Sequence, residues 1–178
     1  MLKKSQVWIE TVIYTLIGLT VIGLILSFAT PKIAAIRDKA IIEQTITALS
    51  DIDKVLSDIS LAPGNIRYVV FTLQKGNLIF NAPANEIEFI LEDSAYTYSE
   101  ANKEIPATQL NLGTLNVFTE VNKTTNVKIW IDYSGNLELT YNNLEQGKKL
   151  SSASVAYRIR FENEKIDGGV ALIDIESS

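Results

Sequence analysis

The stretch Thr11–Pro31, TVIYTLIGLTVIGLILSFATP, decides how this chain is organised, because its 21 residues contain no charge. At about 1.5 Å of rise per residue, a helix of this length matches the hydrocarbon core of a bilayer, which is about 30 Å thick. A cleaved secretory signal has a shorter apolar region, about 7 to 15 residues, and then a small-residue cleavage site. Here the apolar run ends in Pro31 and Lys32. The stretch therefore predicts a membrane-spanning helix that stays in the chain.

Charged residues border this stretch on both sides. The basic ones are Lys3 and Lys4 before it and Lys32, Arg37 and Lys39 after it. Positive charge at both ends does not decide the orientation by count, and we expect the short N-terminal end to lie in the cytoplasm. Glu10 lies at the edge of the run, where an acid drawn toward the membrane centre costs about 2.5 kcal/mol or more. Glu10 is therefore predicted to have a function.

The residues around Glu10 form a short pattern, a basic leader MLKKS followed by QVWIE. This pattern resembles the class III signal peptide of type IV pilin precursors, which a membrane aspartic peptidase cuts on the cytoplasmic side of the apolar segment. The resemblance implies cleavage between Ser5 and Gln6, which makes Glu10 the fifth mature residue. Gln6 and Glu10 are similar to the archaeal pattern Q-x-S-x-E-F, whereas Trp8 and Thr11 depart from it.

The resemblance implies a filament subunit and several partners. The precursor would sit in the membrane, and a prepilin peptidase would remove the leader. An assembly ATPase and a membrane platform would then build a helical homo-oligomer outside the cell, with adhesion as a natural role. In that filament Glu10 would pair with the α-amine of a neighbouring copy, Trp8 would join the helical core, and Gly18 and Gly23 would permit close helix approach.

Three other interpretations share the same N-terminal features. The first is a plain single-pass anchor in which Glu10 reaches back to the membrane interface. The second is a monomeric, membrane-tethered extracellular module that binds or senses a ligand. The third is a minor pseudopilin of a secretion or uptake apparatus.

Beyond the apolar stretch, residues 32–60 continue as an amphipathic helix, because apolar residues recur every three or four positions. They are Ile33, Ile36, Ala40, Ile46, Leu49, Ile52, Leu56 and Ile59. Charged residues are expected to face water on the other side, namely Arg37, Asp38, Lys39, Glu43, Asp51, Asp53 and Asp58. Pro31 removes a helical hydrogen bond, which predicts a kink, a loosened turn or a hinge there. The sequence thus divides into a leader (1–5), a helix (6–60) and a head domain (61–178).

From Ile66 onward the apolar period changes to two, which indicates β-strands. Strands are expected at 66–73, 77–81, 86–92, 95–99, 114–121, 126–133, 136–141, 152–162 and 169–175. Turns containing Gly76, Gly135 and Gly168 are typical of hairpins. With no helical pattern between the strands, the fold class is α+β, a long N-terminal helix followed by an antiparallel β-sandwich-like head.

Composition argues against catalysis and nucleic-acid binding. The chain contains no Cys and no His, and its head carries 10 basic and 15 acidic residues. The remaining catalytic candidates are the carboxylate pairs Glu86 with Glu88 and Glu162 with Glu164, and we interpret both as solvated. The segment 132–136 resembles a calcium-binding turn but also ordinary turn chemistry. We expect no enzyme, cofactor or metal. Asn122 begins the single N-glycosylation sequon, Asn-Lys-Thr.

Overall fold

The computed structural model describes residues 2–105 and 114–178, with side chains described for 8–103 and 114–178. In these ranges the chain forms one long helix, α1 (Leu2–Ile59), and then a head of β-strands. The strands are β1 (Ile66–Phe71), β2 (Asn77–Asn81), β3 (Glu86–Leu91), β4 (Glu104–Ile105), β5 (Asn116–Val121), β6 (Thr125–Asp132), β7 (Leu137–Tyr141), β8 (Gly147–Ser151), β9 (Tyr157–Asp167) and β10 (Val170–Ser177), with a short 3-10 helix η1 (Ala82–Ala84) before β3. The predicted α+β class is confirmed.

The strands form two sheets that share one core. Four strands are ordered β1-β9-β10-β7, and six are ordered β4-β5-β6-β3-β2-β8. Strand pairing is antiparallel except between β10 and β7, which run parallel. The ring of Phe80 on β2 stacks with Tyr141 of β7 and meets Phe161 of β9 edge-on, with centroids 6.4 Å apart in both pairs. The head is therefore sandwich-like, as predicted.

The C-terminal half of α1 belongs to the core of the head. Its buried apolar residues are Ile42, Ile46, Leu49, Ile52, Leu56 and Ile59, of which all but Ile46 are fully buried. They pack in one cluster with the inward faces of both sheets, including Val127, Ile129 and Ile131 of β6. The sheets thus enclose the predicted amphipathic stripe only from Ile46 to Ile59. Its first members, Ile33, Ile36 and Ala40, are exposed, because they precede the point where the helix enters the head, and Ile42, which was not assigned to the stripe, is buried.

Two acidic residues of this half do not face water, contrary to expectation. Asp38 is only 5% exposed, because it accepts hydrogen bonds from Lys75 and from the backbone N–H of Ala95. Asp53 is half-buried, because the hydroxyls of Thr114 and Tyr133 donate to it. Both carboxylates fasten the helix to the head.

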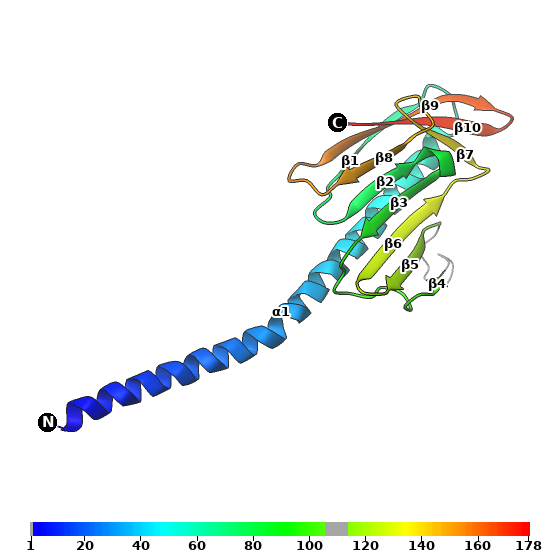
Figure 1. The fold of residues 1–178 in the computed structure, drawn as a ribbon. Helices are drawn as coiled ribbons and strands as arrows, with labels where there is room; N and C mark the ends of the chain where they lie inside the picture. The colour runs from blue at the N-terminus through cyan, green and yellow to red at the C-terminus, as the bar shows by residue number, and fades with distance from the viewer. Residues whose placement is uncertain (1, 106–113) are drawn as a thin grey trace.

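The N-terminal half of α1 projects away from the head (Figure 1). The helix is unbroken from Leu2 to Ile59, and Pro31 lies inside it. Figure 1 shows α1 changing direction about midway along its length. A proline is a sufficient cause of such a bend, because it lacks the N–H of one helical hydrogen bond and crowds the preceding turn. The effect expected at Pro31 is thus a bend within a continuous helix.

The strand predictions were wrong in several places. Residues 95–99 form no strand; Tyr96 and Tyr98 pack against the core instead. The strands β4 and β8 were not predicted, and in β8 (GKKLS) only Leu150 is buried, which leaves little alternation to detect. The strand expected at 152–162 begins at Tyr157 and extends to Asp167.

Two of the three predicted hairpins are crossovers between the sheets. Gly76 and Gly135 adopt the left-handed conformation expected of turns, with φ of 88° and 82°. However, the Gly76 turn joins β1 of one sheet to β2 of the other, and the Gly135 turn likewise joins β6 to β7. Any Cβ at Gly76 would lie 2.7 Å from the carbonyl oxygen of Ile90, so glycine is required there. Gly168 does lie in a hairpin, between β9 and β10.

The tract Leu61–Asn65 ends the helix as predicted, and β9 holds that end in place. The side-chain amide of the fully buried Asn163 donates to the carbonyl of Ile59 over 2.9 Å. Its backbone exchanges hydrogen bonds with Gly64 and Asn65. Asn163 thus satisfies a carbonyl that the helix end leaves without a helical partner.

Candidate assembly surface

The free half of α1 is the largest exposed apolar surface among the described residues. Its exposed large apolar residues are Trp8, Ile9, Val12, Ile13, Tyr14, Leu16, Ile17, Leu19, Val21, Ile22, Leu24, Ile25, Leu26, Phe28, Ile33 and Ile36. A helix that is apolar all round is normally covered by protein or by lipid. The most apolar window has a mean hydropathy of 2.3 and is not buried at all, so by length and composition this helix could cross a membrane.

The hydroxyl groups of the free half are satisfied within the helix. Thr15, Thr20 and Thr30 donate to the carbonyls of residues four positions earlier, and Ser27 donates to Leu24, each over 2.8 Å. A hydroxyl that donates to its own helix needs no water, so its burial costs less than that of an unpaired hydroxyl. These residues are therefore compatible with lipid or with a helix bundle.

Glu10 is the single acid of the free half. Its carboxylate is exposed, and Tyr14, one turn later, points its hydroxyl at Oε1 over 3.5 Å. Among the described side chains no basic group pairs with Glu10. A carboxylate at the end of an apolar helix with only a weak neutral contact within its own chain is available to a partner.

The other residues predicted for assembly lie on the same free surface. Trp8 is 72% exposed, and a Cβ placed on Gly18 or Gly23 would meet nothing within 4 Å. The chain's own packing therefore gives no reason for glycine at these two positions. Ser5 and Gln6 lie within α1, but their side chains are outside the described part, and Met1 is not described.

A group of loop residues contacts the helix where it enters the head. This group consists of Lys75 and the segment 93–99, and we call it the exit collar. Nζ of Lys75 lies 2.9 Å from both carboxylate oxygens of Asp38 and 3.3 Å from the carbonyl oxygen of Asp93. The N–H of Ala95 donates to Asp38 over 2.8 Å. This arrangement fixes the point at which the free helix emerges.

The rest of the exit collar lies beside the next turn of the helix. Nζ of Lys39 is 5.8 Å from the centre of the Tyr96 ring. Burial, and then the charge of Glu43, raises the pKa of Tyr98. The hydroxyl and N–H of Ser99 both bond to Oγ1 of the buried Thr119 on β5. The segment that was expected to be a strand therefore links the helix to the six-stranded sheet.

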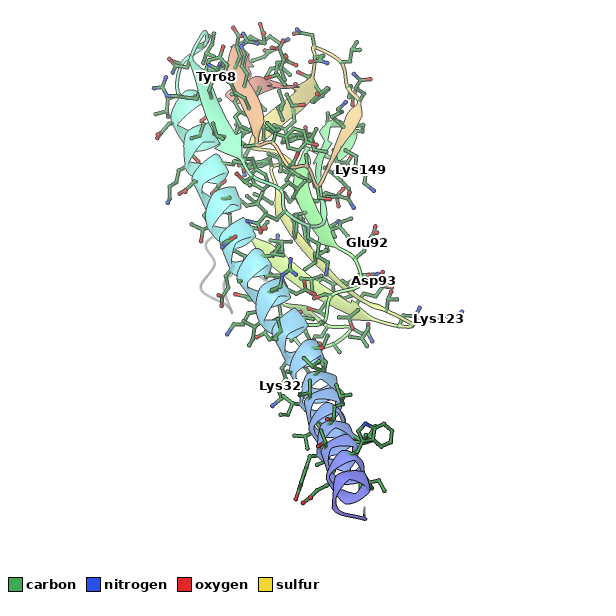
Figure 2. The ribbon with its side chains drawn as sticks, turned by 90° about the vertical axis from the view of Figure 1, so that its left-hand side faces the viewer. Lys32, Tyr68, Glu92, Asp93, Lys123 and Lys149 are labelled. Carbon is green, nitrogen blue, oxygen red and sulfur yellow. The ribbon has the colours of Figure 1, made fainter. Side chains whose placement is uncertain are left out.

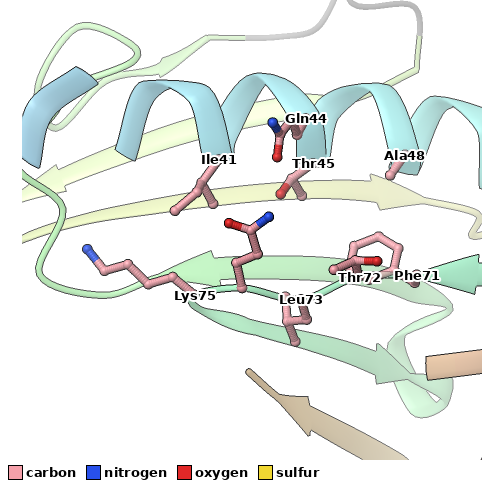
Figure 3. A pocket seen from close by; sticks show the side chains of 9 residues that line it. Ile41, Gln44, Thr45, Ala48, Phe71, Thr72, Leu73 and Lys75 are labelled. Atoms are coloured by element: carbon pink, nitrogen blue, oxygen red, sulfur yellow. The ribbon is translucent and has the colours of Figure 1, made fainter. Parts of the chain in front are cut away.

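A small cavity lies next to Lys75, between α1 and the crossover from β1 to β2 (Figure 3). Its volume is about 40 Å³, and Ile41, Thr45 and Ala48 of the helix face the segment 71–75 across it. Ligand sites usually measure about 300 to 1,000 Å³, so this cavity has room for water molecules and not for a metabolite.

Three of the four candidate catalytic carboxylates, Glu86, Glu88 and Glu162, are in ion pairs, and Glu164 is exposed. Lys128 lies 2.7 Å from Glu88 and 3.9 Å from Glu86, and Arg160 pairs with Glu162. Burial raises the pKa of Glu86, although the charge of Lys128 opposes this. Contrary to expectation Glu88 is not solvated: it is only 8% exposed, and Lys128 of the neighbouring strand β6 neutralises it. Arg160 and Glu162 lie on the same strand, β9.

The possible calcium-binding turn is held together by its own side chains. The N–H of Ser134 donates to Asp132 over 2.8 Å. The hydroxyl of Ser134, and then this N–H, lower the pKa of Asp132. Within the described residues, no group of three acidic side chains is placed to hold a metal ion.

Asn122 occupies the exposed turn between β5 and β6. In Figure 2 its neighbour Lys123 projects to the side of α1, at the end of the head nearer to Lys32. The sequon is therefore accessible.

Sequence reasoning missed the exit collar, although a signal for it exists. Asp38 precedes the buried Ile42 by one helical turn, so it lies on the apolar face of the helix and not on the solvent-exposed face. No family model, curated protein or solved structure matches the chain. Its function must therefore be inferred from these surfaces.

Proposed function

We propose that this chain is a structural, non-catalytic subunit of an extracellular type IV pilus-like filament of the archaeal type. A precursor would lie in the membrane with residues 1–5 in the cytoplasm and the head outside. After cleavage by a prepilin peptidase, an ATPase-driven platform would transfer the free helix from lipid into a bundle of identical helices. The heads would coat the filament and provide adhesion.

The observation that carries this proposal is the division of α1 into two halves. The half after Asp38 is part of the core of the head, whereas the described side chains before it are mostly apolar and exposed. When the free helix moves from lipid into a bundle of apolar helices, its hydrophobic burial changes little. Close packing and hydrogen bonds between helices would therefore decide whether it is more stable in the filament than in the membrane. A head that does not depend on the free helix for its core can remain folded in both places.

Glu10 is assigned a role in register. Cleavage before Gln6 would expose an α-amine that is mostly cationic at neutral pH, one helical turn from Glu10. In the filament core this amine of one copy would pair with Glu10 of the next. Desolvating both ions offsets much of their attraction, so the pair would specify docking more than strengthen it. If Gln6 cyclises to pyroglutamate, Glu10 would accept a hydrogen bond instead.

The first test is the mature N-terminus of the surface-exposed protein, read by mass spectrometry alongside electron microscopy of the cells. We expect loss of Met1 to Ser5 together with filaments. Replacing Ser5 with leucine should leave uncleaved precursor in the membrane. An intact Met1 on surface-exposed, monomeric protein would instead identify a membrane-tethered module and refute the filament.

The second test compares Glu10→Ala with Glu10→Gln. Both variants should be processed and inserted normally, because Glu10 lies at the edge of the apolar run. Filament yield should fall strongly for alanine, and less for glutamine if the partner is a hydrogen-bond donor. A wild-type filament yield from Glu10→Ala would refute the pairing.

A further inference from the structure

Tyr14 carries the one phenolic hydroxyl of the apolar run Thr11–Pro31. The serine and threonine hydroxyls of this run that were described above donate to carbonyls of their own helix. The hydroxyl of Tyr14 lies at the end of a rigid ring and donates instead to Oε1 of Glu10 over 3.5 Å. Glu10 is the one acid among residues 1–37. The single phenol of the apolar run is thus directed at the single acid beside it.

The spacing of the two residues favours this contact. Residues four apart lie on the same face of a helix, and long side chains lean toward its N-terminus, so Tyr14 covers the turn that carries Glu10. Tyr14 is 66% exposed, and Glu10 is exposed as well. The pair therefore faces outward, where lipid or another copy of the chain would lie.

The hydrogen bond is long in the free chain, and either environment proposed for the free helix would strengthen it. Lipid and a helix bundle both exclude water, and a tyrosine hydroxyl that is buried without a partner is costly. A hydrogen bond to a carboxylate is shorter and stronger than one between neutral groups. We therefore expect the bond from Tyr14 to Glu10 to shorten when the helix is buried.

Under the proposed function, Glu10 would have two amines within its reach. One is the α-amine of its own chain at Gln6, one helical turn earlier, and the other belongs to a neighbouring copy. The N-terminus of a helix attracts acids, and the side chain of Glu10 leans toward it, so pairing within the chain would compete with pairing between copies. Tyr14 follows Glu10 by one turn, on the side away from Gln6, and its bond to Oε1 leaves Oε2 for an incoming amine.

We infer that Tyr14 is a positioning residue for Glu10: its hydroxyl holds one carboxylate oxygen, so that the other accepts the α-amine of a neighbouring copy instead of the amine of its own chain. The inference rests on the proposed function and adds a residue that determines the specificity of the pairing. The same hydroxyl supplies a donor to Glu10 while the precursor lies in the membrane, where an acid without a partner is costly.

The test removes the hydroxyl and keeps the ring. Full-length Tyr14→Phe, expressed in cells that make filaments, should lower filament yield about fivefold or more, the factor that one typical hydrogen bond contributes to an equilibrium. Leader cleavage and the amount of membrane-inserted protein should stay as in the wild type, read by mass spectrometry and immunoblotting. The matched control, Tyr68→Phe, removes the hydroxyl of a tyrosine that is 54% exposed on the head and should assemble normally.

A second readout asks whether Tyr14 acts through Glu10. In a Glu10→Ala chain the hydroxyl has lost its acceptor, so adding Tyr14→Phe should not lower the residual filament yield further, as quantified by immunoblotting of sheared filaments. Independent sites have additive effects on free energy, so a further fivefold loss would overturn the inference.

The outcomes separate this inference from the proposed function. Wild-type yield from Tyr14→Phe, beside a reduced yield from Tyr14→Leu, would show that the ring packs and the hydroxyl positions nothing. A fall in membrane-inserted protein that matches the fall in filaments would show that Tyr14 anchors the helix in the membrane. Either result would overturn this inference alone, whereas a wild-type chain that forms no filaments would overturn the proposed function and this inference with it.

Discussion

Removing the ammonium group of Lys75 should destabilise the head more than deleting one partner of any exposed ion pair, because it leaves the buried carboxylate of Asp38 without its cationic partner. The carboxylate side chain is 7% exposed and the lysine side chain is 39% exposed. After Lys75→Ala, Asp38 would keep only the N–H of Ala95 as a donor. After Asp38→Ala, by contrast, Lys75 can turn into water, and Ala95, which is an exposed residue, loses only the acceptor of its N–H.

These differences set the expected magnitudes. Removing one partner of a buried ion pair costs about 3 to 5 kcal/mol. Because the side chain of Lys75 is partly exposed to solvent, we expect Lys75→Ala to lower the free energy of unfolding by about 3 kcal/mol, the lower end of this range. A hydrogen bond to a charged group contributes about 1.5 to 3 kcal/mol, so Asp38→Ala, which removes the bond from Ala95, should cost about 2 kcal/mol. The double variant should cost less than the sum of both, with a coupling energy of about 2 kcal/mol.

The assay is urea unfolding of the fragment Lys32–Ser178, followed by fluorescence. This fragment contains Trp130 and lacks Trp8, so one tryptophan reports on the head. The matched control is Lys54→Ala, because Lys54 pairs with Asp51 on the exposed face of the same helix. Such surface pairs contribute about 0 to 1 kcal/mol. If Lys75→Ala costs no more than Lys54→Ala, the exit collar does not hold the helix.

Four further outcomes are expected. The fragment Lys32–Ser178 should fold alone as a β-rich monomer, because it contains the whole buried core; circular dichroism showing disorder, or light scattering showing obligate oligomers, would contradict this. Burial raises the pKa of Glu86, so the folded state binds this proton more readily than the unfolded state does. Protonated Glu86 therefore stabilises the fold below the ordinary carboxyl pKa, and this stabilisation is lost as pH rises through the folded pKa. Glu86→Gln should therefore stabilise the fragment at pH 7 and lose that advantage in acid, in paired denaturant titrations. Asn163→Ala should cost about 1 to 3 kcal/mol by leaving the Ile59 carbonyl without its donor, seen as a lower Tm. Native filaments should carry a glycan at Asn122. Thr124→Ala and Asn122→Gln should each lower the subunit mass by the mass of this glycan while filaments persist. Subunit masses that change only by the substitution itself would argue against the site.

Local pattern was sufficient to predict the helix and most strands. The run from Thr11 to Pro31 has no charge, and the spacing of Leu49, Ile52, Leu56 and Ile59 follows the helical period, so both halves of α1 could be predicted. Alternation within a strand such as β6 also depends only on neighbours in the sequence. These are the features that the structure confirms.

Partners distant in sequence could not be predicted in the same way. A turn glycine such as Gly76 indicates a reversal, but not whether the next strand stays in the same sheet. The Ala95–Ser99 segment has strand composition, yet its tyrosines find burial against a helix more than 40 residues earlier in the sequence. Asp38 shows the same limit, because a charge on an apolar stripe indicates burial only when a distant lysine is known to meet it.

The contacts of Asp38 with Lys75 and Ala95 also bear on how the free helices would be oriented in an assembly. An apolar helix with no preferred face can pack on neighbours in many rotations, so its sequence alone selects no single arrangement. Because α1 is continuous through the exit collar, fixing Asp38 to Lys75 and Ala95 fixes the rotation of every free residue relative to the head. The direction in which Glu10 and the basic residues Lys32 and Arg37 point is then set by the fold of the head. Under the proposed function, the head thereby provides the register that the apolar helix lacks, and Glu10 adds a second constraint at its far end.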